Sequence, residues 1–195
     1  MDLRRFIVFL LIALPCTARG DDVAARMQAA RIVANELAQK LGAALREQLA
    51  ASGPEGAISV CKDMAPQLAG ELSRRTGWRV ARVSLRTRNP LLGLPDAWEQ
   101  LALQRFDQAA VRDEAPEKLE FGEIVVEPQG QYFRYVKALP VQPLCLICHG
   151  PQEVIAESVR SRLAAEYPHD RATGYVMGQI RGAVTIKQPL RGTAP

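Results

Sequence analysis

The pattern of apolar positions predicts two helices in the first part of the chain. A stripe at i, i+3/i+4 spacing runs through Val23, Met27, Ala30, Ala34, Leu37, Leu41 and Leu45. Asp21 and Asp22 can cap this helix, which we expect to run to about Ser52, where the segment 53–56 (GPEG) breaks it. A second helix is predicted over about 57–74, with one apolar face made by Ile58, Cys61, Ala65, Leu68 and Leu72.

The pattern changes after residue 77 to short alternating runs. We expect strands over 78–86, 119–127, 132–139 and 182–188, with a hairpin turn at 128–130. Asp96 can cap a helix that carries Trp98, Leu101 and Phe106, and 153–166 has the pattern of another helix. Strands and helices do not alternate as βαβ units, so the expected class is α+β: a small antiparallel sheet flanked by helices and preceded by a long N-terminal helix.

The first twenty residues differ from the rest. Arg4 and Arg5 precede an apolar run from Phe6 to Pro15, and small residues follow at 18–20. This arrangement is typical of a secretory signal peptide, and the apolar run is too short to span a bilayer. We expect cleavage after Gly20 or nearby, a periplasmic location, and no transmembrane span in the mature chain. A lipid-acceptor role for Cys16 and a twin-arginine signal are alternatives that the flanking residues fit less well.

The charge balance excludes one class of partner. The formal net charge is +4, and it falls to +2 without residues 1–20, which contain three Arg and one Asp. No Lys/Arg cluster indicates nucleic acid binding.

The sequence Cys145-Leu-Ile-Cys148-His149 carries the clearest chemistry. Cys-x-x-Cys-His is the attachment signature of c-type haem: the thiols form thioethers with the vinyl groups of one porphyrin, and the histidine lies under the iron. A redox dithiol, half of a zinc site or a structural disulfide are the alternatives, but a zinc site lacks a second ligand pair. Pro140 and Pro143 before the motif and Gly150-Pro151 after it place it on a loop. We therefore expect one covalently bound haem c.

The sixth iron ligand stays open at this point. The candidates are Cys61, His169, a water molecule, and the methionines Met27, Met64 and Met177. A buried cysteine that acts as a small apolar residue is an ordinary alternative for Cys61.

Several short stretches resemble the stand-alone and sensor-attached c-type haem domains with a PAS-like fold. These are Ala57–Lys62 with Ala65-Pro66, Arg88-Asn-Pro90 followed by Pro95–Glu99, the haem motif with Gly150, Tyr167–Asp170 with Gly174-Tyr175, and Gly178–Ala183. The resemblance implies a PAS-like antiparallel sheet and a six-coordinate haem with His149 on one side and Cys61 on the other. This sequence departs from the family pattern at Leu92-Gly93, a region where the family often has a second Asn.

These observations predict three parts: a signal peptide (1–20), an amphipathic helix (21–52) and a PAS-like haem domain (53–190). Thiolate ligation stabilises ferric iron, and its loss on reduction suits a redox or gas sensor; the alternative is a low-potential electron-transfer protein. We expect no enzymatic activity. The partners would be a redox or signalling protein, or a second copy through the helix 21–52. Arg88 and Arg181 are candidates for the haem propionates, and Tyr132 and Tyr135 for packing on the ring.

Overall fold

The computed structural model describes residues 18–112 and 114–190. Most of the expected signal peptide, residues 1–17, lies outside that range. Helix α1 runs from Ala18 to Ser59 and is interrupted at Gly53, whose φ of 68° and ψ of −174° are not helical. The predicted break is therefore confirmed. None of the helices in the described residues is long and apolar enough to cross a membrane.

The helix that restarts after Gly53 is built from more than one kind of helical turn. A π-helical turn (Val60–Met64) follows α1, and α2 (Ala65–Thr76) completes the run. It ends at Gly77, which adopts a left-handed conformation (φ 72°) and donates its N–H to the carbonyl of Ser73. The predicted second helix is confirmed, but the π-turn within it has no signature in the apolar pattern.

Four antiparallel strands form a single sheet in the order β1-β4-β3-β2. They are β1 (Arg79–Val83), β2 (Glu120–Glu127), β3 (Gly130–Pro140) and β4 (Ile180–Pro189). The hairpin between β2 and β3 pairs Glu127 with Gly130, as the turn residues predict. The register of β3 against β4 shifts between Leu139 and Pro140, just before the Cys-x-x-Cys-His segment.

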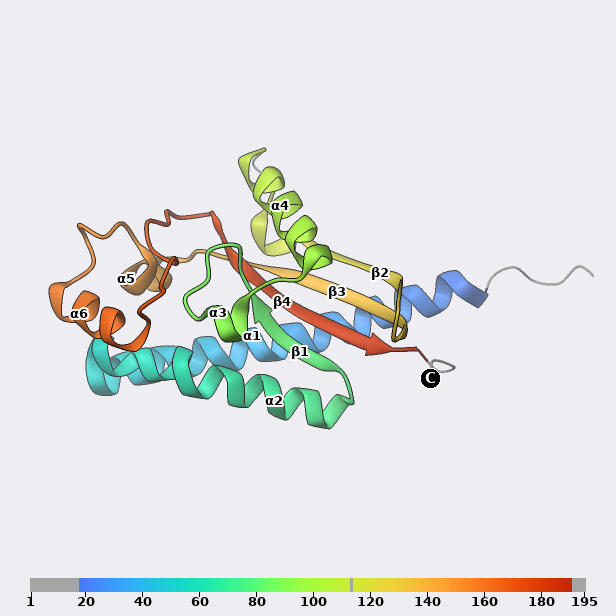
Figure 1. Cartoon of the computed structure of the whole chain (residues 1–195), viewed down its shortest axis with the longest axis horizontal. Helices are drawn as coiled ribbons and strands as arrows, with labels where there is room; N and C mark the ends of the chain where they lie inside the picture. The colour runs from blue at the N-terminus through green and yellow to red at the C-terminus, as the bar shows by residue number, and fades with distance from the viewer. Residues whose placement is uncertain (1–17, 113, 191–195) are drawn as a thin grey trace, which may run out of the picture.

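Helices α1 and α2 cover one face of this sheet (Figure 1). The side chains of Leu37 and Leu72 are fully buried against Phe133, Tyr135 and Ile186 of the strands. The apolar stripe of the long N-terminal helix thus packs on the sheet of its own chain. Burial of apolar side chains, which stabilises by about 25 cal/mol per Å² of apolar surface, is the main stabilising contribution to the fold.

Helix α4 (Ala97–Val111) lies on the other side of the sheet (Figure 1). Leu103 and Phe106 pack there against Val136 and Ala183. Asp96 and Glu99 form a capping box at its N-terminus, which confirms the predicted cap. The α+β class, with an antiparallel sheet flanked by helices and preceded by a long helix, is confirmed.

The remaining elements are short, and two of them contain the Cys-x-x-Cys-His segment. They are α3 (Pro90–Gly93), 3₁₀ turns at Pro116–Lys118 and Pro143–Cys145, α5 (Leu146–His149) and α6 (Glu157–Glu166). The expectation that the motif lies on a loop is wrong. Pro143 stands in the first turn of a short helical segment, where its missing N–H is not needed.

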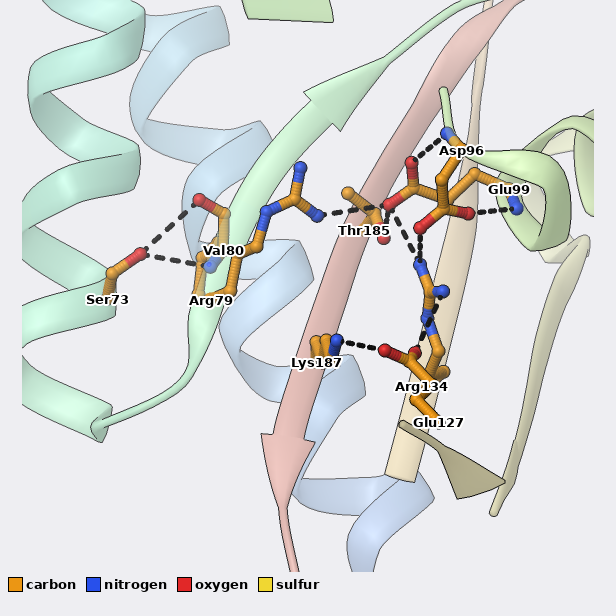
Figure 2. Close-up of polar contacts among 9 residues, drawn as sticks. All are labelled: Ser73, Arg79, Val80, Asp96, Glu99, Glu127, Arg134, Thr185 and Lys187. Atoms are coloured by element: carbon orange, nitrogen blue, oxygen red, sulfur yellow. Dashed lines mark hydrogen bonds and ion pairs between the residues drawn. The ribbon is translucent and has the colours of Figure 1, made fainter. Parts of the chain in front are cut away.

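A buried ionic network joins the N-terminus of α4 to the sheet (Figure 2). The Glu99 carboxylate accepts hydrogen bonds from Thr185 Oγ1 (2.8 Å), Arg79 Nη1 (3.1 Å) and Arg134 Nη2 (3.2 Å). Its other oxygen accepts from the Asp96 backbone N–H at 2.9 Å. Glu99 is 0% and Arg134 is 4% exposed, so neither charge can be solvated if its partner is lost.

We predict that Glu99→Ala lowers the free energy of unfolding by about 3–5 kcal/mol, because it leaves a buried guanidinium with fewer partners. Urea unfolding followed by circular dichroism measures the change. Glu114→Ala removes an exposed pair with Arg112 and is the control, with an expected effect below about 0.5 kcal/mol. Equal effects of the two substitutions would contradict the role of the network.

Candidate functional site

The Cys-x-x-Cys-His segment is held against the residues that precede β4. Backbone hydrogen bonds join Val141 N to Gln179 O (2.8 Å), Tyr175 N to His149 O (2.9 Å) and Gly174 N to Gly150 O (2.7 Å). Strand β3 leads into the motif, and the segment 174–179, which is hydrogen-bonded to the motif and to Val141, leads into β4. Two neighbouring strands therefore fix the position of the motif. The site therefore lies at the end of the sheet where α5 and α6 gather (Figure 1).

His149 has a defined tautomer in this arrangement. Its Nδ1 lies 2.6 Å from the backbone oxygen of Ala172, and a carbonyl can only accept, so Nδ1 carries the proton. Burial lowers the pKa of His149 well below its usual value, and the charges of Arg181 and Arg88 act in the same direction. The ring is consequently neutral, and Nε2 presents a lone pair, as in a histidine that binds a metal.

The two cysteine side chains of the motif are half-buried in different apolar groups. Cys145 packs beside Val141, Ala172 and Tyr175. Cys148 packs against a cluster formed by Ile58, Ile155, Val159, Leu163 and Tyr167. Burial raises the pKa of the Cys148 thiol, although the Arg88 charge opposes the shift. The thiols are free, and apolar walls flank both of them, as the edge of a porphyrin requires.

Cys61 lies in the π-turn and belongs to the same end of the molecule. Its side chain is half-buried, and its charge contributes to the raised pKa values of Cys148 and Tyr167. The sequence pattern placed Cys61 on an inward face of its helix, and Ile58 of the same face packs in the cluster that includes Cys148. Among residues 18–112 and 114–190, no three His, Cys, Asp or Glu side chains gather into a group that could hold a metal ion.

The other candidates for an axial ligand have different surroundings. His169 is exposed, and Met64 and Met177 are 39% and 53% exposed. Met27 packs against the core between α1 and the sheet.

Arg88 connects the segments that build the site. It is 8% exposed, and its Nε donates to Asp170 Oδ2 at 3.1 Å. Its Nη2 donates to the carbonyls of Cys148 (2.5 Å) and Ala172 (3.3 Å). The Asp170 carboxylate also accepts from the Ala172 N–H at 2.7 Å. One guanidinium therefore holds both the motif and the carbonyl that orients His149.

Arg181, at the start of β4, lies directly beside the imidazole. Its Nε is 3.2 Å from Nδ1 and 3.4 Å from Nε2 of His149, while Nη1 donates to Ser84 Oγ (2.8 Å) and Arg86 O (3.2 Å). Burial lowers its pKa. Both arginines proposed from the sequence thus lie at the site.

The two tyrosines proposed from the sequence lie elsewhere. Tyr132 packs beneath the Lys187 ammonium, 3.9 Å from the ring centroid. Tyr135 is fully buried in the core beneath α1, and its hydroxyl donates to Glu120 at 2.8 Å. The structure therefore does not bring either side chain to the motif.

Tyr175 and Tyr167 supply the aromatic surroundings instead. The Tyr175 ring is edge-on to His149, with centroids 6.2 Å apart, and Tyr167 packs in the Cys148 cluster. Sequence reasoning did not single out their roles. The only available signal was their place in the stretches Tyr167–Asp170 and Gly174-Tyr175.

The residues present fit a covalently attached haem: two free, half-buried thiols with the required spacing, a neutral imidazole held by its Nδ1 proton, and basic side chains nearby. Fold and site together define an α+β domain that presents a Cys-x-x-Cys-His motif at one end of an antiparallel sheet. More particularly, the chain belongs to the Tll0287-like family, described as Tll0287, which it matches over residues 16–189.

A solved structure gives a second comparison. The chain is similar to the crystal structure of the cyanobacterial heme-protein Tll0287, with 28% sequence identity and a TM-score of 0.54. The similarity covers 69% of this chain and 74% of that chain. No protein with a curated description matches.

We predict that Arg88→Ala lowers the free energy of unfolding by about 3 kcal/mol, because it leaves Asp170 and two carbonyls without their donor. Chemical unfolding measures the loss, and limited proteolysis should show earlier cleavage between residues 141 and 179. Arg171→Ala, at an exposed neighbour, is the control. Unchanged stability and cleavage in Arg88→Ala would contradict the role assigned to Arg88.

Proposed function

We propose that this protein is an exported c-type haem protein that carries one haem. Each thiol, Cys145 and Cys148, adds as S–H across one vinyl group of the porphyrin and forms a thioether. His149 binds the iron through Nε2. The observation that carries the proposal is the 2.6 Å contact between His149 Nδ1 and Ala172 O, because it prepares the imidazole as a ligand beside two free thiols.

The comparison supports the choice of cofactor. The similar cyanobacterial protein is described as a heme-protein, and the family match spans the motif and Cys61. Bound haem would supply one-electron chemistry at iron and a coordination position that small gases can take.

We assign Cys61 as the second axial ligand. Its side chain lies close enough to Cys148 for its charge to affect the pKa of that thiol. Arg181 is also near, since the charge of Cys61 acts to raise the pKa of that guanidinium against the larger effect of burial. Coordination at His149 Nε2 requires Arg181 Nε to leave its present place 3.4 Å away. The haem propionates offer this guanidinium a carboxylate partner in exchange.

The role we favour is that of a redox or gas-responsive sensor. A thiolate stabilises ferric iron, and its bond weakens on reduction, so Cys61 can leave while His149 stays. Cys61 lies on a helix that continues into α2, which packs on the sheet together with α1. Loss of the ligand can therefore alter a large part of the fold. A low-potential electron-transfer protein is the second candidate.

Location and partners complete the proposal. Residues 1–20 direct export to the periplasm, where c-type haem is attached. Cys61 in the sixth position of the ferric protein would keep a substrate from the iron in that state, so we propose no enzymatic activity. A redox or signalling partner, or a second copy of this chain, would contact the outer face of α1, where Ile32 is 57% exposed.

We predict that protein exported by cells able to attach haem is coloured, and that its denatured mass exceeds that of the polypeptide by one haem. Mass spectrometry of the denatured protein measures this. Cys145→Ser with Cys148→Ser should lose the covalent mass. Cys61→Ser is the control and should keep it, because Cys61 forms no thioether. A colourless wild-type protein with the bare polypeptide mass would refute the proposal.

We predict that the ferric wild-type protein has a low-spin thiolate signature in electron paramagnetic resonance, and that Cys61→Ala loses it. An unchanged spectrum in the variant would exclude Cys61 as the ligand.

Reduction separates the two roles. In a sensor, reduced wild-type protein shows a shifted Soret band and binds CO. A reduced protein that stays six-coordinate, does not bind CO and exchanges electrons rapidly is instead an electron carrier.

A further inference from the structure

The π-turn changes the hydrogen bonding of the helix at Cys61. Ser59, Met64 and Ala65 keep helical backbone angles, so the chain remains a helix through this point. The Ala65 N–H, however, donates to Val60 O, five residues back, rather than to Cys61 O, four residues back. One extra residue is thereby accommodated in the turn that contains Cys61.

Pro66 provides the physical reason for this turn. In a regular helix Pro66 would face the carbonyl of Lys62, but it has no N–H to donate and its ring would collide with that carbonyl. Widening the turn relieves the collision. It also leaves Cys61 O without a donor in its own helix, because Ala65 bonds to Val60 and the next residue is the proline.

Arg82 supplies the missing donor from the sheet. Its Nη2 lies 3.4 Å from Cys61 O, and Arg82 is placed in β1 opposite Val184 of β4. A carbonyl without any partner in a half-buried position costs about 1–3 kcal/mol, so this contact matters for the turn. The next residue, Lys62, forms an ion pair with Glu166 of α6. The turn that contains Cys61 is therefore contacted by β1 and by α6.

We infer that Pro66 and Arg82 are positioning residues for Cys61: Pro66 enforces the π-turn, and Arg82 anchors the carbonyl that the turn releases. Each residue of a helix turns the side-chain direction by about 100°, so one additional residue decides whether Cys61 faces the motif. Neither residue touches the iron in this proposal. The inference rests on the assignment of Cys61 as axial ligand made above.

The experiment compares holoprotein variants, exported and loaded with haem, by electron paramagnetic resonance and thermal unfolding. In Pro66→Ala the thiolate signal should fall to the level of Cys61→Ala, while the melting temperature stays equal or rises, because alanine favours a regular helix. Arg82→Gln should also weaken the signal, and Arg82→Lys should restore part of it, since an ammonium can donate to the same carbonyl.

Pro54→Ala is the matched control. Pro54 follows Gly53, where the helix restarts, so its missing N–H costs nothing and its removal should leave the signal unchanged. A wild-type signal in Pro66→Ala and Arg82→Gln, with the signal lost in Cys61→Ala, overturns this inference and leaves the proposed ligands intact. A wild-type signal in Cys61→Ala overturns the ligand assignment itself. If Pro66→Ala does not fold, an undiminished signal in Arg82→Gln still overturns the inference.

Discussion

The hydrogen bond between His149 Nδ1 and the carbonyl of Ala172 is the contact on which the site depends. It fixes the tautomer and the plane of the ring at once, and burial keeps the ring neutral. Residue Ala172 is held in turn by two neighbours: Arg88 donates to its carbonyl oxygen, and the Asp170 carboxylate accepts from its N–H. The imidazole is thus oriented through residues far away in the sequence.

The sheet explains how such distant residues meet. Strand β3 delivers the motif at its end, and β4 begins with Arg181 directly beside it, so the register of two paired strands sets the geometry of the site. Buried charges are partnered differently at the two faces of the sheet. On the α4 side, both carboxylate oxygens of Glu99 accept hydrogen bonds, and the network joins the helix to the sheet. Arg181 beside His149 is also buried, which lowers its pKa, but its hydrogen-bond partners are neutral groups rather than a carboxylate.

The sequence predicted the elements better than their contacts. The helices, the strands, the hairpin and the cap at Asp96 follow from apolar periodicity and turn chemistry, which are local. Cys145, Cys148 and His149 could be proposed from the sequence alone because their spacing is the one that covalent haem attachment requires. Tyr135 was proposed for the site but lies in the core, because its side chain is on the face of β3 that α1 covers, and the motif ten residues further along the chain does not reveal which face that is. Arg82 and Tyr175 were missed, because only tertiary contacts bring them to the site.

The two sides of the site differ in how firmly they are built. His149 sits in a short segment that backbone hydrogen bonds and Arg88 attach to its surroundings. Cys61 sits in a widened helical turn, where one carbonyl relies on a single long contact to the sheet. If a ligand is to leave iron on reduction, the less constrained side is the one that can move at low cost. If Cys61 is the ligand proposed above, this asymmetry is consistent with the proposed sensor role, because a carrier gains from two equally rigid ligands that keep reorganisation small.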